Sequence, residues 1–139
     1  MATNIRPKLS AKNKYWIEKH RYYELKHFCL QYLMWKRTYA AIDELSIQTS
    51  RLEQSISSSS PSDLTAKYAI RKAYYSEKIE LIEQIARAAD EDLYDYILKA
   101  VTEGLSYTYL KTKLEIPCGR DMYYDRYRKF FWLLNDARD

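Results

Sequence analysis

The sequence predicts an all-α protein in which a long antiparallel helical hairpin is followed by a group of shorter helices. Its 139 residues include only 2 glycines and 3 prolines, which argues against hairpin-rich β folds because their turns need glycine. Apolar residues recur instead at spacings of three and four, the period of one helical face. With 47% hydrophobic residues, the chain has enough apolar surface for one domain, or for a small domain with a helical arm.

The first long helix is expected to begin near Ala11, with Ser10 as its N-cap. Neither glycine nor proline interrupts residues 8–56. Because so long a helix is unusual in a globular protein, we expect a break, and the β-branched and polar residues 46–50 are its expected position. The apolar stripe of this segment runs over Tyr15, Trp16, Tyr22, Tyr23, Leu25, Phe28, Cys29, Tyr32, Leu33, Trp35, Tyr39, Ile42, Leu45, Leu52 and Ile56.

A polar loop then leads into a second long helix. Residues 57–63 are rich in serine and contain Pro61, and both residue types favour turns. The helix that follows is predicted from about Leu64 to Ala88. Two long helices joined by one short loop pack as an antiparallel hairpin, so residues 1–89 are expected to form a basic helical arm or hairpin.

Three shorter helices are predicted in residues 90–139. The acids at positions 90–92 suit the first turn of a helix, where they oppose the positive end of its dipole. This helix is expected to reach about Glu103, with Gly104 as its terminator. Ser106 can cap the next helix, which is predicted over residues 107–114.

A tight turn over residues 116–119 separates that short helix from the last one. Pro117 cannot continue a helix, and Gly119 allows a positive φ. The last helix is predicted from Arg120 to Asn135. Three helices of this size, the last two joined by a short turn, define a three-helix helix-turn-helix unit.

The last helix divides into an apolar and a basic face. The apolar residues are expected to form the core, namely Tyr123, Tyr127, Phe130, Phe131 and Leu134. In a helix-turn-helix the last helix enters the DNA major groove, so Arg120 and Tyr124 are predicted to read bases. Lysines on the short helix suit phosphates. The predicted DNA-binding residues are Arg120, Tyr124, Arg128, Lys111, Lys113, Arg126 and Lys129.

The carboxy-terminal region resembles small phage regulators of late transcription, the RinA and ArpU types, whose helix-turn-helix is similar to sigma factor region 4. The resemblance lies in residues 102–110, 114–117 and 120–128. It implies a phage-encoded, sequence-specific DNA-binding transcriptional regulator. The residues that would set up DNA contact by this resemblance are Gly104, Ser106, Ile116, Pro117, Arg120 and Tyr124.

Charged residues are unevenly distributed along the chain. Residues 1–37 hold nine Lys/Arg against two acids, residues 38–104 seven against twelve, and residues 105–139 seven against five. This pattern favours internal pairing, or contact with a polyanion through the ends only.

The 15 tyrosines and the acidic middle also suit a phage-encoded protein-binding inhibitor of a host factor, such as an anti-CRISPR or RNA polymerase-binding protein. A third possibility is an assembly protein whose helical hairpin oligomerises.

No catalytic or metal-binding pattern is found, so we expect neither an enzyme nor a cofactor. His20 and His27 are too far apart in sequence to share a zinc ion easily, and two glycines cannot build a phosphate-binding loop. The unpaired Cys29 and Cys118 indicate a reducing compartment, and no secretory signal or membrane-spanning run is predicted. The expected partner is double-stranded DNA, with RNA polymerase or another host protein as a further possibility. The expected form is a homodimer in the cytoplasm of a bacterial host cell.

Overall fold

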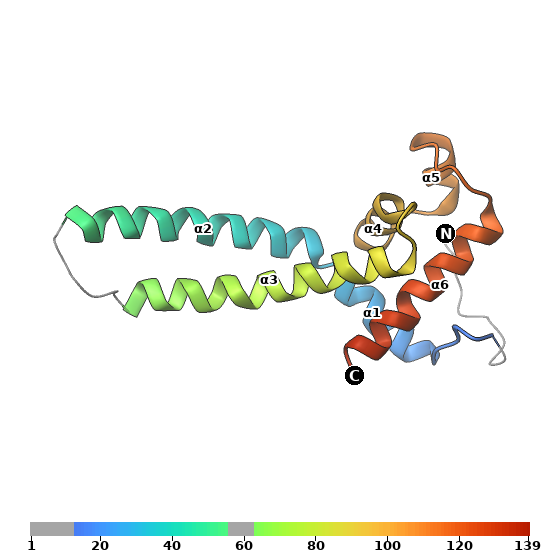
Figure 1. Ribbon diagram of the computed structural model, residues 1–139, viewed down its shortest axis with the longest axis horizontal. Helices are drawn as coiled ribbons and strands as arrows, with labels where there is room; N and C mark the ends of the chain where they lie inside the picture. The colour runs from blue at the N-terminus through green and yellow to red at the C-terminus, as the bar shows by residue number, and fades with distance from the viewer. Residues whose placement is uncertain (1–12, 56–62) are drawn as a thin grey trace. The chain divides into compact units, whose positions relative to one another are not determined.

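The computed structural model describes residues 13–55 and 63–139, without the side chains of Glu53 and Ser55. These residues form helices and connecting turns with no strand, so the all-α prediction is confirmed. Their contacts define two compact units, one of Tyr32–Leu81 and the other of the described residues up to Gln31 together with Ile82–Asp139. The helices are α1 (Lys19–Cys29), α2 (Tyr32–Ser55), α3 (Asp63–Ala89), α4 (Tyr94–Glu103), α5 (Tyr107–Lys113) and α6 (Arg120–Ala137) (Figure 1).

The first long helix starts later and breaks earlier than predicted. Residues 13–18 are not helical, and α1 begins after Glu18, whose carboxylate accepts hydrogen bonds from the amides of His20 and Arg21. The break lies at residues 30–31, whereas residues 46–50 are helical. A β-branched or polar residue lowers the stability of a helix by only a few tenths of a kcal/mol relative to a good helix former. This cost is too small to break a helix whose other residues are held by packing. The predicted Ser10 cap lies outside the described residues.

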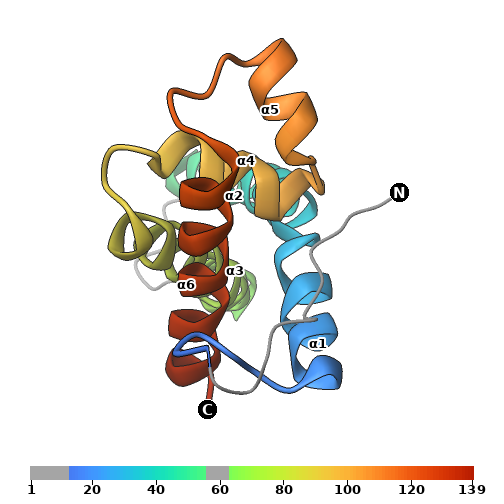
Figure 2. The same cartoon turned by 90° about the vertical axis from the view of Figure 1, so that its right-hand side faces the viewer.

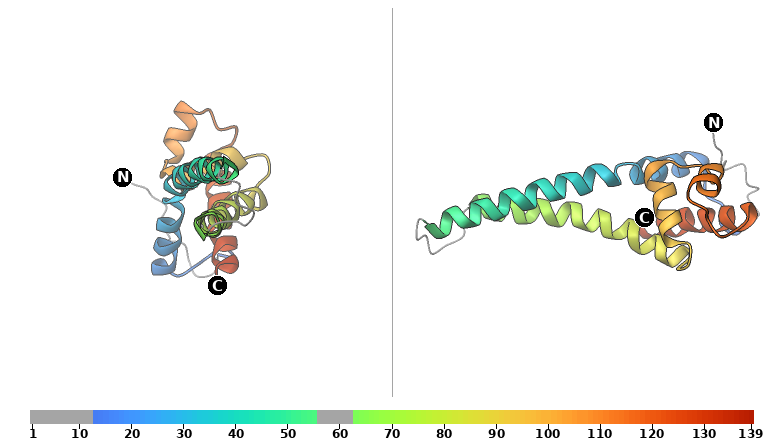
Figure 3. Two further views of the ribbon diagram at one scale, coloured as in Figure 1. Left: turned by 90° about the vertical axis from the view of Figure 1, so that its left-hand side faces the viewer. Right: turned by 90° about the horizontal axis from the view of Figure 1, so that it is seen from above.

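Within the unit Tyr32–Leu81, α2 and α3 lie side by side and antiparallel (Figures 1 and 3). Trp35 and Ile42 of α2 are buried. The ammonium of Lys72 donates to Asp43 Oδ1 at 2.8 Å. This contact places the middle of α2 beside the middle of residues 63–81, the part of α3 that belongs to this unit. The predicted helix 64–88 corresponds to α3, while the predicted loop over residues 57–62 lies outside the described residues.

The predicted ends of the shorter helices are largely reproduced. Gly104 ends α4 in the left-handed region with φ 71°, and Ser106 caps α5 by accepting a hydrogen bond from the Tyr109 amide. The acids at positions 90–92 precede α4 instead of forming its first turn. There Asp90 accepts hydrogen bonds from the amides of Asp92 and Leu93.

The turn between α5 and α6 departs from the prediction at one backbone position. Gly119 has a φ of −81°, and the positive φ of 54° falls on Glu115 instead. The reversal at Glu115 directs the following Ile116 into the interior, where it is 1% exposed, and lets its amide donate to the Leu110 carbonyl. Burial of Ile116 therefore determines where the chain turns.

In the other unit, α1 packs against α6 (Figure 2). The hydroxyls of Tyr22 and Tyr127 form a buried hydrogen bond of 2.9 Å, and the ring of Tyr22 lies 5.1 Å from that of Phe131. The predicted apolar face of the last helix is buried, which confirms that part of the prediction. These contacts place α1 in the same unit as α6, whereas the division from sequence, 1–89 and 90–139, placed it with the hairpin.

The hydrogen bond between the two tyrosines provides a stability test. Burial raises the pKa of the Tyr127 phenol well above its usual value, so this hydroxyl is neutral. Tyr22→Phe leaves the Tyr127 hydroxyl buried without this hydrogen bond, and we expect a loss of about 1–3 kcal/mol in the free energy of unfolding. Tyr127→Phe should cost a similar amount, and the double variant should cost less than the sum of the two. Denaturant unfolding of the three variants measures this, and strict additivity would contradict it.

Candidate nucleic-acid interface

The first turns of α6 present an arginine supported by two tyrosine rings. Arg120, the first residue of α6, is exposed. Its guanidinium carbon lies 5.0 Å from the ring centroid of Tyr107 and 6.0 Å from that of Tyr124. Such cation–π contacts restrict the side chain while its N–H groups stay accessible. Arg120 is therefore oriented before it meets a ligand.

Tyr107 connects α5 to this part of α6. Its ring is 7% exposed and packs 5.5 Å from the ring of Tyr123. Its hydroxyl donates to the carbonyl of Cys118 at 2.7 Å, so it also holds the turn that precedes Arg120. The half-buried Tyr124 completes the cluster, with its ring 6.2 Å from that of Tyr107. The sequence by itself assigns Tyr107 no role in the site, because only the fold brings its ring to Arg120.

The charged residues around Arg120 are of both signs. Lys111 and Lys113 of α5 are exposed, as predicted for residues that would contact phosphates. Glu115 and Asp121 are exposed as well. The surface formed by the α5–α6 turn and its flanks is therefore mixed in charge rather than uniformly basic.

The side chain of Arg126 forms hydrogen bonds with two carboxylates of the same chain. Its Nε donates to Asp90 Oδ2 at 2.8 Å, and its Nη1 donates to Asp125. Burial acts to raise the pKa of Asp90, but the hydrogen bonds from Arg126 and from the amides of Leu93 and Asp92 outweigh it and lower that pKa. Arg126 therefore joins α6 to the α3–α4 turn and is not part of the candidate interface.

The other two predicted basic residues of α6 are less accessible than Arg120. Arg128 and Lys129 are half-buried, and Arg128 Nε is buried without a hydrogen-bond partner. Arg128 follows Tyr124 at a spacing of four, on the face that continues to Trp132 and Asn135. Of these, Arg128 and Asn135 are half-buried, whereas Trp132 is 41% exposed.

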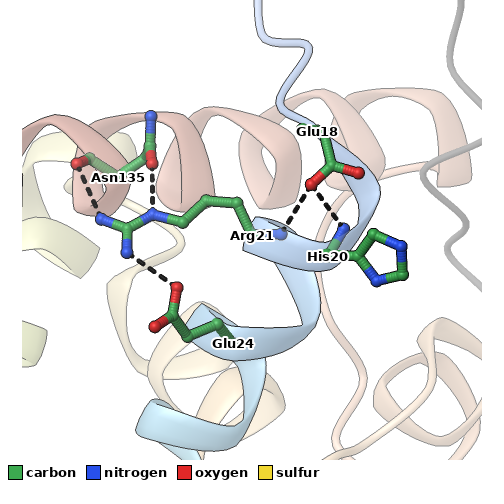
Figure 4. Close-up of polar contacts among 5 residues, drawn as sticks. All are labelled: Glu18, His20, Arg21, Glu24 and Asn135. Carbon is green, nitrogen blue, oxygen red and sulfur yellow. Dashed lines mark hydrogen bonds and ion pairs between the residues drawn. The ribbon is translucent and has the colours of Figure 1, made fainter.

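Residues near the start of the described chain contact the second half of that face. The ring of Tyr15 lies 5.7 Å from that of Trp132. Arg21 Nε donates to Asn135 Oδ1 at 2.6 Å, while Nη1 pairs with Glu24 (Figure 4). Of the predicted row, Arg120 is exposed, whereas Tyr124 and Arg128 are both half-buried.

No protein-family model, curated protein or solved structure matches this chain. Within residues 13–55 and 63–139, no group of three or more His, Cys, Asp or Glu side chains is placed to hold a metal ion. No helix among the same residues has the length and apolar character needed to cross a membrane.

Proposed function

We propose that this chain is a phage-encoded, sequence-specific DNA-binding transcriptional regulator in which the amino-terminal half of α6 enters the major groove. The observation that supports this best is Arg120, which is exposed at the start of α6 and oriented by Tyr107 and Tyr124. Arginine recognises guanine through two parallel hydrogen bonds, and an arginine that is already oriented loses less entropy on binding.

The other assignments of this proposal follow from the same arrangement. Lys111 and Lys113 would contact phosphates, which fix the register of a protein on DNA without reading sequence. Tyr124 would lie beside the bases that Arg120 reads. The proposed setting is the cytoplasm of a bacterial host cell, with a homodimer on double-stranded DNA and RNA polymerase as a further partner. A relation to the RinA and ArpU types belongs to the same proposal.

The test compares Arg120→Ala with the unchanged chain on duplexes that the latter selects from a randomised pool. We expect Arg120→Ala to weaken binding to the selected duplex by about 5- to 150-fold, which corresponds to about 1–3 kcal/mol. The loss should be smaller on an unselected duplex, because phosphate contacts carry no sequence information. Fluorescence anisotropy at several salt concentrations measures both affinities.

Arg87→Ala is the matched control. Arg87 also lies over a tyrosine ring, at 4.0 Å from that of Tyr94, and its side chain is 55% exposed. It is far from Arg120 in sequence, on α3, and we expect the affinity for the selected duplex to change less than twofold. Equal losses for the two variants, or none for Arg120→Ala, would refute the role of Arg120.

The mixed charge near Arg120 favours one other candidate, a protein that binds and blocks a host factor. Of the seven predicted DNA-binding residues, Arg126 is held by Asp90, and the exposed Asp121 and Glu115 lie near Arg120 in sequence. Tyrosine and arginine are also enriched in protein interfaces. This candidate predicts that no duplex is selected from the pool and that the chain co-purifies with one host protein.

A further inference from the structure

The turn between α5 and α6, residues 117–119, is held to the rest of the protein by few contacts. Pro117 and Gly119 are exposed. Apart from its chain neighbours, a Cβ added at Gly119 would meet no atom within 4 Å. Pro117 has no amide hydrogen to donate, and no side chain caps α6 at Gly119. Packing therefore does little to fix the position of this turn, although Arg120 follows it directly.

One side chain connects the turn to α5. The hydroxyl of Tyr107 donates a hydrogen bond to the Cys118 carbonyl at 2.7 Å. Among the described residues, no other side chain forms a hydrogen bond with residues 117–119. Tyr107 is buried, so its hydroxyl is held in place relative to α5. The position of the turn therefore depends strongly on this single hydrogen bond.

The same tyrosine also contacts the side chain that follows the turn. The guanidinium carbon of Arg120 lies 5.0 Å from the centroid of the Tyr107 ring. The ring orients the guanidinium, while the hydroxyl fixes the backbone from which Arg120 extends. The two contacts can be separated chemically, because Tyr107→Phe removes the hydroxyl and keeps the ring.

We propose that the Tyr107 hydroxyl is a positioning group that determines sequence discrimination through Arg120. The inference rests on the proposed DNA binding and identifies a group that sets how well a base is read without touching DNA. Two parallel hydrogen bonds from arginine to guanine require a defined position of the guanidinium. A turn without its hydrogen bond to α5 would occupy that position for a smaller fraction of the time, and the apparent affinity would fall by that fraction.

Contacts with phosphates should not depend on this hydroxyl. Lys111 and Lys113 extend from α5, which lies before the turn, and phosphates carry no sequence information. The hydroxyl should therefore change the ratio of the affinity for a selected duplex to the affinity for an unselected duplex, which we term the discrimination ratio. The affinity for the unselected duplex should be nearly unchanged.

The first test measures the discrimination ratio of Tyr107→Phe by fluorescence anisotropy. We expect the ratio to fall about 3- to 10-fold, an effect of the size of one hydrogen bond. The affinity for the unselected duplex should change less than twofold.

Tyr22→Phe is the matched control for Tyr107→Phe. It also removes the hydroxyl of a buried tyrosine that is hydrogen-bonded within the same unit, but at the contact between α1 and α6. We expect it to change the discrimination ratio less than twofold, even though it lowers the stability of the unit. An unchanged ratio in Tyr107→Phe, or equal losses in the two variants, would overturn the proposal.

The second test establishes whether the hydroxyl acts through Arg120. In a chain that already carries Arg120→Ala, Tyr107→Phe should change the discrimination ratio less than about 1.5-fold, because the guanidinium that it positions is absent. A further fall as large as in the unchanged chain would indicate an effect that does not pass through Arg120, and it would overturn the proposal. A chain that selects no duplex, or whose ratio is insensitive to Arg120→Ala, would refute the proposed reading of DNA and this inference with it.

Discussion

Leu25→Ala in α1 is expected to lower the free energy of unfolding of the unit that contains α6 by about 2–5 kcal/mol. Leu25 is 0% exposed and lies on α1, which packs against α6 and α4. Alanine would lose the transfer free energy of the removed carbons and leave a cavity in a close-packed interior. Denaturant unfolding followed by near-UV circular dichroism measures the loss, because the aromatic residues of α6 contribute to that signal.

Leu30→Ala is the control for Leu25→Ala. It makes the same chemical change five residues further along, at a side chain that is 41% exposed. We expect it to cost less than about 1 kcal/mol, because less apolar area is removed from the interior. Hydrogen exchange separates the possible outcomes, since Leu25→Ala should reduce the protection of the amides in α6 as well as in α1. If α6 kept its protection, α1 would not be an integral part of this unit.

Asp90→Ala is expected to destabilise the same unit by about 1.5–3 kcal/mol, the usual range for hydrogen bonds that involve charged groups. The Asp90 carboxylate accepts from Arg126 and from the amides of Asp92 and Leu93, and its side chain is 12% exposed. Its loss would leave the Arg126 guanidinium, 32% exposed, without its hydrogen-bond acceptor on this turn. Thermal or denaturant unfolding at neutral pH measures the difference from the wild-type chain.

Asp90→Ala should also change the dependence of stability on pH. Because the pKa of Asp90 is lowered in the folded protein, its contribution is present above the unfolded pKa of about 3.9. It is lost as the pH falls through the folded pKa. The wild-type chain should therefore lose its advantage over Asp90→Ala in acid. The control Asp92→Ala, at an exposed position of the same turn, should cost less than about 0.5 kcal/mol. A constant difference from pH 7 to the acid limit would contradict this account.

The sequence by itself was enough to predict much of the secondary structure, because the signals for it are local. Gly104 ends α4 because glycine adopts the left-handed conformation without strain, and Ser106 caps α5 because its hydroxyl can accept from a free amide two or three residues on. The buried face of α6 follows from a periodic pattern of large aromatic residues. Each of these features depends on residues within about three helical turns, which a sequence displays directly.

Only the tertiary structure decided the features that depend on residues far apart in the chain. The packing of α1 on α6 and the hydrogen bond of Arg126 to Asp90 each follow from burial or charge that long-range packing brings together. The same holds for the candidate interface, because Tyr107 reaches Arg120 across a turn whose position is set by the burial of Ile116. Periodicity identifies which face of a helix is apolar but not which helix covers it, since many partners bury an apolar face with similar free energy.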